Sequence, residues 1–238
     1  MRLILDGTVV RVRLDRKATS ISLLVVIGVR ADGHKILLAV KNMGGETTEA
    51  WRAILDDLVA RGLRRPEFLI VDGAPGLDGS IAGLWDGVPV QRCTVHKHRN
   101  LLAHAPERLH EEISADYTDM IYAATPEEIE SRRKAFLRKW RLKCRAVADS
   151  LEEAGERLFA SRACRRAGGK APELQTRLSV CMKSSSGASR PRPCCLRPKP
   201  RQMLFWALIA SGQISMRKIH GWHTLPAKPL DQQIDLAA

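Results

Sequence analysis

Two aspartates, Asp6 and Asp72, each stand at or near the end of a short apolar run and are each followed by glycine. The run before Asp72, residues 68–71, is rich in branched side chains and predicts a buried strand with the carboxylate at its C-terminal end. Carboxylates on neighbouring strand ends suit Mg²⁺ or Mn²⁺, which prefer hard oxygen ligands and support phosphodiester chemistry. A plainer interpretation stays open, because Asp-Gly pairs also form ordinary turns.

A second group of chemically capable side chains follows in one short run: Cys93, His96, Lys97, His98 and Arg99. A zinc site built on the cysteine and the histidines is disfavoured, because no second ligand pair lies at finger-like spacing. Packing is the alternative role for Cys93, since free cysteines are commonly buried. Lys97 and Arg99 are expected either to contact phosphate groups or to be merely exposed.

The elements that must position these residues can be read from the hydrophobic pattern. Three β-rich runs joined by short links, one of them at Asp32-Gly33, predict an antiparallel meander. Strand and helix patterns then alternate, which is typical of parallel α/β units. The expected strands are 1–14, 21–30, 34–41, 68–71 and 88–91, and the expected helices are 47–62, 77–85 and 93–102.

This order predicts an α/β fold of the ribonuclease H-like type, a mixed sheet flanked by helices. In that arrangement the first and fourth strands lie side by side, so Asp6 and Asp72 are expected to face each other. Residues 1–102 would form this core. A helical insertion is predicted over residues 103–160, where apolar side chains recur at helical spacing and basic residues populate the other face, a pattern typical of a solvated helix surface.

The segment 161–202 has no hydrophobic period and predicts a disordered basic stretch. It contains 11 Lys and Arg against one acid, Glu173, and so holds +10 of the net charge of +13. The charge of the rest is therefore small and says little about a nucleic-acid partner. An apolar helix is expected to begin at Met203 and to lead into the tail of the last region, 203–238.

Composition also bounds the setting of the protein. No apolar run approaches the length of a membrane-spanning helix, and an acid already appears at position 6, so neither a membrane span nor a signal peptide is expected. A cytoplasmic location with reduced cysteines follows as the expectation. The length of 238 residues allows one large or two small domains.

Three stretches resemble the Mutator-type family of bacterial insertion-sequence transposases. They are Asp6-Gly7-Thr8, residues 70–77, and Gln91-Arg92-Cys93-Thr94-Val95-His96 with Arg99-Asn100-Leu101-Leu102. The Cys-x-x-His run is the specific part of this match, whereas the Asp-Gly pairs alone are weak. The likeness runs over about residues 3–160 and again over 203–238.

The resemblance implies a ribonuclease H-like enzyme with an Asp-Asp-Glu triad that holds Mg²⁺ or Mn²⁺. It implies cleavage of DNA at transposon ends, joining of the freed 3′-hydroxyl to target DNA, and a homo-oligomer when the protein is intact. Asp6 and Asp72 match the two aspartates, and Cys93 and His96 match the motif beside the second one. Lys97 and Arg99 are then candidates for DNA contact.

Two departures from the family pattern are apparent. We expect no counterpart of the family's N-terminal DNA-binding region, since five residues stand ahead of Asp6, and the place of the catalytic glutamate falls in the segment 161–202. Back-translation of residues 176–183, read one nucleotide earlier, permits a charged helical sequence with a glutamate encoded across Leu178 and Ser179. We therefore expect that 161–202 is out of frame and that this copy is impaired. A metal-dependent nuclease of the same fold and a non-catalytic DNA-binding or regulatory fragment are the alternatives.

Overall fold

The computed structural model describes residues 1–14, 17–42 and 44–160. Within these residues the chain divides into two compact units, Met1–Val88 and residues 89–160. No helix of the described residues is both long enough and apolar enough to cross a bilayer. The two predicted C-terminal regions, 161–202 and 203–238, lie outside the described residues.

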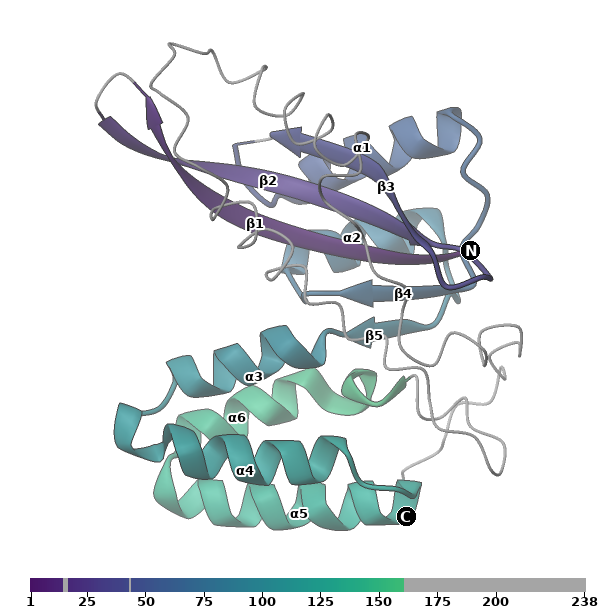
Figure 1. Cartoon of the computed structure of the whole chain (residues 1–238). Coiled ribbons are helices and arrows are strands. Elements are labelled where there is room, and N and C mark those ends of the chain that lie inside the picture. Colours follow the sequence, from purple (N-terminus) through teal and green to yellow (C-terminus); the bar gives the residue numbers. More distant parts are fainter. Residues whose placement is uncertain (15–16, 43, 161–238) are drawn as a thin grey trace. The chain divides into compact units, whose positions relative to one another are not determined.

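The first unit is built on a mixed sheet in which the strands run in the order β3-β2-β1-β4 (Figure 1). The three meander strands pair antiparallel, and β1 pairs with β4 in parallel, with Leu5 opposite Val71. All four residues of β4 are buried, as expected for a strand covered on both faces. The strands are β1 (Arg2–Leu14), β2 (Lys17–Val29), β3 (Lys35–Asn42) and β4 (Phe68–Val71).

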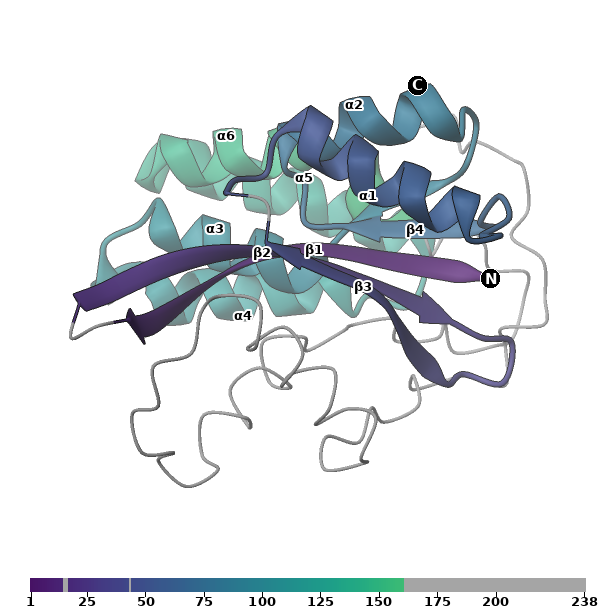
Figure 2. The same cartoon turned by 90° about the horizontal axis from the view of Figure 1, so that it is seen from above.

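Helices α1 (Thr48–Ala60) and α2 (Pro75–Leu84) lie side by side on one face of this sheet (Figure 2). Thr47 caps α1, because its side chain accepts a hydrogen bond from the Ala50 N–H at 3.2 Å. Val59 lies beyond the edge of the apolar stripe of α1 and is 41% exposed. The buried stripe is Ala50, Trp51, Ile54, Leu55 and Leu58.

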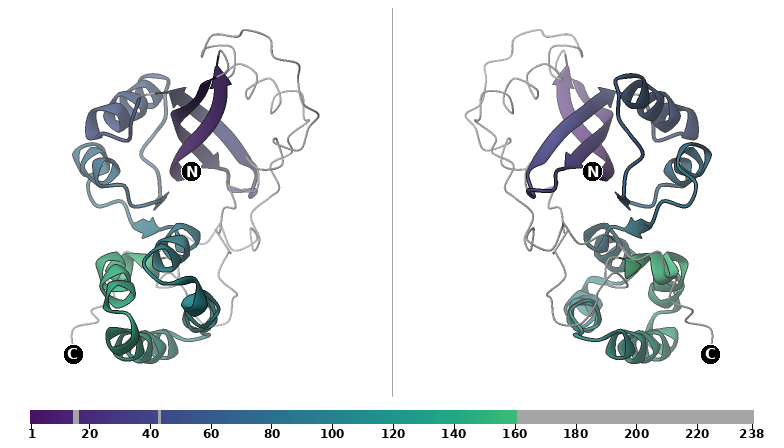
Figure 3. Two further views of the ribbon diagram at one scale, coloured as in Figure 1. Left: turned by 90° about the vertical axis from the view of Figure 1, so that its left-hand side faces the viewer. Right: turned by 90° about the vertical axis from the view of Figure 1, so that its right-hand side faces the viewer.

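The second unit consists of one short strand and a helical bundle, seen nearly end-on in Figure 3. Thr125 caps the longest helix, accepting from the Glu128 N–H at 3.2 Å, and proline stands at the start of that helix, where its missing N–H costs nothing. The elements are β5 (Val90–Arg92), α3 (Thr94–Ala103), the 3₁₀ turn Glu107–Leu109, α4 (His110–Ile121), α5 (Pro126–Lys143), α6 (Arg145–Ala154) and the 3₁₀ turn Gly155–Leu158.

Trp140 of α5 is central to the core of this bundle and is fully buried. Its indole N–H donates to Asp116 Oδ2 at 2.9 Å, so burying the ring leaves no polar group unsatisfied. Leu101 of α3 is also fully buried in the same core. For this reason α3 groups with the helices, and the boundary between the units falls at Val88 rather than at residue 102 as the sequence pattern indicated.

The expected elements are present, with shifted boundaries. β2 begins at Lys17, four residues before the apolar run, because Lys17 pairs with Leu14 and the hairpin ladder supplies backbone hydrogen bonds to a polar segment. β5 begins at Val90 instead of residue 88. The α/β class and the predicted adjacency of the first and fourth strands are confirmed.

Candidate active site

The parallel pairing of β1 with β4 brings Asp6, inside β1, next to the C-terminal end of β4, which Asp72 follows. Leu5 and Val71 are the last paired residues, and each aspartate follows directly. Asp72 Oδ2 accepts a hydrogen bond from the Gly7 N–H at 3.1 Å. The Asp72 carboxylate therefore contacts the peptide that joins Asp6 to Gly7.

The other oxygen of Asp72 is also oriented by backbone. Oδ1 accepts from the Ala74 N–H at 2.9 Å, a local turn that aspartate favours. Gly73, between them, has φ of +93°, a conformation that glycine adopts without the penalty of a Cβ. Each Asp72 oxygen thus receives one N–H bond and keeps a lone pair for a further partner.

Asp6 is far more enclosed than Asp72: the residue is 6% exposed, whereas Asp72 is half-buried. A carboxylate removed from water to that extent is costly unless hydrogen bonds or a cation compensate for the loss of hydration. The pair thus combines one enclosed carboxylate with one that solvent or a substrate can reach.

The donor set fits a hard divalent cation in type, because Asp6 and Asp72 both offer carboxylate oxygens. It falls short in number, since no group of three or more His, Cys, Asp or Glu in the described part of the chain is arranged to hold a metal ion. Water, a phosphate oxygen or a further carboxylate would have to complete the coordination.

The Cys-x-x-His run opens α3. Cys93 stands at the N-cap position, and both Cys93 and His96 are half-buried. His98 stacks on Tyr117 of α4 with ring centroids 5.2 Å apart, and the Tyr117 hydroxyl donates to the Thr94 carbonyl at 2.8 Å. Thr94 and His98 therefore attach the start of α3 to α4 by a hydrogen bond and ring stacking.

The pKa of His98 also reflects its partial burial. Burial, aided by the neighbouring positive charge of Arg99, holds the pKa of His98 below its ordinary value. Its Nε2 lies 3.0 Å from Ser114 Oγ. An imidazole with a lowered pKa, a hydroxyl partner and a stacked ring fits a packing role.

Lys97 and Arg99 are placed very differently, although both were candidates for DNA contact. Lys97 is 2% exposed, and its ammonium donates to the Ser150 carbonyl at 2.6 Å and to Glu153 Oε2 at 2.7 Å. An ammonium enclosed in this way does not reach a phosphate, so the expectation for Lys97 does not hold in this structure. Arg99 is exposed and stays a candidate.

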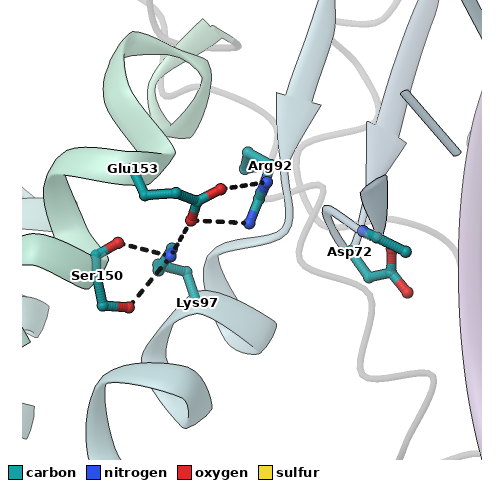
Figure 4. A network of polar contacts seen from close by, with 6 residues as sticks. Asp72, Arg92, Lys97, Ser150 and Glu153 are labelled. Carbon is teal, nitrogen blue, oxygen red and sulfur yellow. Dashed lines mark hydrogen bonds and ion pairs between the residues drawn. The ribbon is translucent and has the colours of Figure 1, made fainter. Parts of the chain in front are cut away.

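The carboxylate of Glu153 in α6 forms ion pairs with two buried cations (Figure 4). Its carboxylate accepts from Lys97 and also from the guanidinium of Arg92, at 3.0 and 3.3 Å. Burial favours the neutral acid, but the Lys97 hydrogen bond and the charges of Arg92 and Lys97 outweigh it and hold the pKa of Glu153 below its usual range. This network ties β5 and α3 to α6.

Sequence reasoning missed Glu153 as a partner, and no local pattern could have revealed it. Arg92 and Glu153 are 61 residues apart, and Lys97 and Glu153 are 56 apart. From sequence alone, an acidic residue in a polar helix is predicted to be exposed to solvent. The one available signal was that Arg92 sits inside a short strand, where a charged side chain needs a partner.

A mixed sheet in which the first strand pairs antiparallel with the second and parallel with the fourth, with one aspartate inside the first strand and another just after the end of the fourth, defines a ribonuclease H-like α/β protein. The sequence matches the family model "Transposase, Mutator family" over residues 1–168. The chain belongs to the Mutator family of transposases.

Named relatives are similar over part of their length. The chain is 35% identical over 131 residues to the transposase for insertion sequence element IS6120 of Mycolicibacterium smegmatis, covering 55% of this chain and 40% of that protein. It is 33% identical over 141 residues to the transposase for insertion sequence element IST2 of Acidithiobacillus ferrooxidans, covering 59% and 48%. The chain thus spans less than half the length of these relatives.

Among solved structures, the catalytic core domain of BIV integrase matches 78% of this chain and 95% of its own, at 13% identity and a TM-score of 0.26. A TM-score this low leaves the fold assignment to rest on the strand order.

Proposed function

We propose that this chain carries the catalytic core of a DNA transposase, which cuts DNA at the ends of an insertion sequence and joins the freed 3′-hydroxyl to target DNA. The observation that carries the proposal is the 3.1 Å bond from the Gly7 N–H to Asp72, which holds the second aspartate against the residue that follows the first. The family supports the same chemistry, because the relatives are named transposases for insertion sequence elements.

Asp6 and Asp72 would hold Mg²⁺ or Mn²⁺, which supplies Lewis acidity at phosphate and lowers the pKa of bound water. The chain's own contribution is orientation. The Gly7 and Ala74 N–H groups fix both Asp72 oxygens before substrate arrives, so the carboxylate needs little reorganisation. Thr94 and His98 hold the start of α3 against Tyr117 of α4, and Arg99 supplies an exposed positive charge for the DNA backbone.

We further propose that this copy is impaired, because the third carboxylate of the triad is missing. The family match ends at residue 168, within the basic segment 161–202 where the glutamate is expected. Glu173 is a poor replacement, since Gly168, Gly169 and Pro172 stand just before it and oppose a rigid helix. A reading-frame slip over this segment accounts for both observations.

Its DNA substrates would place the protein in the cytoplasm of a bacterium. Because two transposon ends must be processed together, the intact transposase would act as a homo-oligomer with one Asp6–Asp72 site for each end.

The experiment is to restore the frame between about codons 160 and 202 and compare the two proteins on labelled transposon-end DNA with Mg²⁺, since losing one of three metal-positioning ligands removes most activity. We expect strand cleavage by the repaired protein, none by the present one, and none by the repaired protein carrying Asp72→Asn. Equal cleavage by the present and repaired proteins would refute the frame slip. Full cleavage by the repaired Asp72→Asn variant would refute the assigned site.

A further inference from the structure

A third carboxylate lies against Gly7, the residue of β1 that follows Asp6. A Cβ placed on Gly7 would overlap the carboxylate of Glu46, so that carboxylate rests directly against the Gly7 backbone. The same Gly7 donates its N–H to Asp72. Glu46 belongs to the loop before α1, far from both aspartates in the sequence, and it is half-buried.

The backbone at Glu46 is held from two sides. On one side Thr47 caps α1. On the other side α2 packs so closely that a Cβ on Gly76 would lie 2.6 Å from the Glu46 carbonyl oxygen and 2.7 Å from the Thr48 nitrogen. Ser80 of α2 adds a hydrogen bond to the Thr48 carbonyl at 2.8 Å. The position of Glu46 is therefore built by α1 and α2 together.

We propose that Glu46 is a positioning residue of the Asp6–Asp72 site, which strengthens the binding of a divalent cation there through its charge and its contact with Gly7. The inference rests on the proposed function. Glu46 acts without direct ligation, since the described residues form no three-ligand metal group. A half-buried negative charge against the Gly7 backbone, whose N–H binds Asp72, raises the affinity for a dication at the neighbouring site, because its field is screened less than that of a surface charge.

The test is Mn²⁺ binding by the full chain, followed by the electron paramagnetic resonance signal of free Mn²⁺. We expect Glu46→Gln to weaken binding on the order of fivefold, the size of one partly screened charge acting on a dication. Glu49→Gln is the matched control: it makes the same charge change three residues on, at an exposed position in the first turn of α1. It should change the affinity less than about twofold, since a solvated charge is screened.

Gly7→Ala provides a second variant that keeps Glu46 ionised. The new methyl group would occupy the place of the Glu46 carboxylate, which can swing away because it is the end of a flexible side chain. We therefore expect Gly7→Ala to weaken Mn²⁺ binding about as much as Glu46→Gln, with a far-ultraviolet circular dichroism spectrum like that of the wild type. The double variant should be no weaker than either single variant, because both remove the same interaction.

Two results separate this inference from the proposed function. If Asp72→Asn weakens Mn²⁺ binding but Glu46→Gln behaves like Glu49→Gln, Glu46 has no positioning role and the inference fails alone. If Asp72→Asn leaves binding unchanged, the metal site itself fails and the inference with it. Additive losses in the Gly7→Ala, Glu46→Gln double variant would also overturn the inference, since the two residues would then act independently.

Discussion

The two units treat their carboxylates in opposite ways. In the second unit, Glu153 accepts hydrogen bonds from the buried cations Arg92 and Lys97, so positive charges of the chain itself neutralise its negative charge. In the first unit, Asp72 accepts from the N–H groups of Gly7 and Ala74, which orient it without neutralising its charge. The ion pairs of Glu153 stabilise the fold of the second unit, whereas the Asp72 carboxylate keeps a negative charge that a cation can bind.

Under the proposed function, this difference distinguishes an acid that stabilises the fold from an acid that binds a cation. A carboxylate paired with buried cations costs stability when it is removed, because the cations lose their partner. Removing a carboxylate that only backbone N–H groups orient lowers folding stability less, but a cation then loses one of its ligands. The predictions below test that distinction.

Glu153→Ala should give the largest effect on stability. It removes the carboxylate partner of two side chains that are 2% and 7% exposed, and we expect a loss of about 2–3 kcal/mol, below the range for a fully buried pair because the Glu153 side chain is 56% exposed. Urea denaturation followed by circular dichroism measures it.

Glu152→Ala is the control for that loss. Glu152 lies next in the chain and pairs with Arg141, but both side chains are well exposed, so the cost should stay under about 1 kcal/mol. Equal losses in the two variants would contradict a special role for the buried network.

The same network predicts an acid-dependent stability. Because the pKa of Glu153 is lowered on folding, its contribution is complete above the unfolded carboxyl pKa of about 4.3 and is lost as the pH falls through the folded value. The stability difference between wild type and Glu153→Gln should therefore shrink on acidification. Urea titrations at several pH values between neutrality and mild acid measure it, and a constant difference would rule this linkage out.

Lys97 and Arg99 should separate by the kind of damage their removal causes. Arg99→Ala should weaken DNA binding several-fold and reduce the salt slope of log K by about one, at unchanged stability. Lys97→Met should lower stability instead, because it removes the donor to Glu153 and Ser150. Fluorescence anisotropy over a salt series, together with urea denaturation, distinguishes them. A reduced salt slope for Lys97→Met at unchanged stability would instead indicate that Lys97 contacts DNA.

Cys93→Ala should give a small effect. Cys93 is half-buried and its thiol is free, so we expect a loss of about 1 kcal/mol or less and an unchanged Mn²⁺ affinity. A loss of Mn²⁺ binding would instead indicate that the Cys-x-x-His run is part of the metal site.

The strands and helices of the first unit were predictable because each carries its own local signal. Phe68–Val71 is a continuous apolar run, and Thr47 precedes a helical stripe. The meeting of Asp6 with Asp72 was also predictable, because it follows from the order of the elements and not from their side chains.

The burial of Lys97 could not be predicted, because a basic residue in a basic run looks exposed until its distant partner Glu153 is known. The contact of Glu46 with Gly7 was equally hidden, since it depends on how α2 presses the loop against the sheet at Gly76. Contacts between side chains far apart in the chain carry no periodic signature. The positions of the two aspartates were therefore predictable from the sequence, whereas the contacts of Lys97 and Glu46 were not.

The most direct measurement is a Mn²⁺ titration of the full chain as wild type, as Asp6→Asn, as Asp72→Asn and as the exposed control Asp86→Asn. The account predicts that each of the first two substitutions weakens binding by at least about tenfold, since two carboxylates supply the described ligands and each is needed. It predicts that Asp86→Asn binds like the wild type. If Asp6→Asn and Asp72→Asn also bind like the wild type, the two aspartates are turn residues and the proposed catalytic site is contradicted.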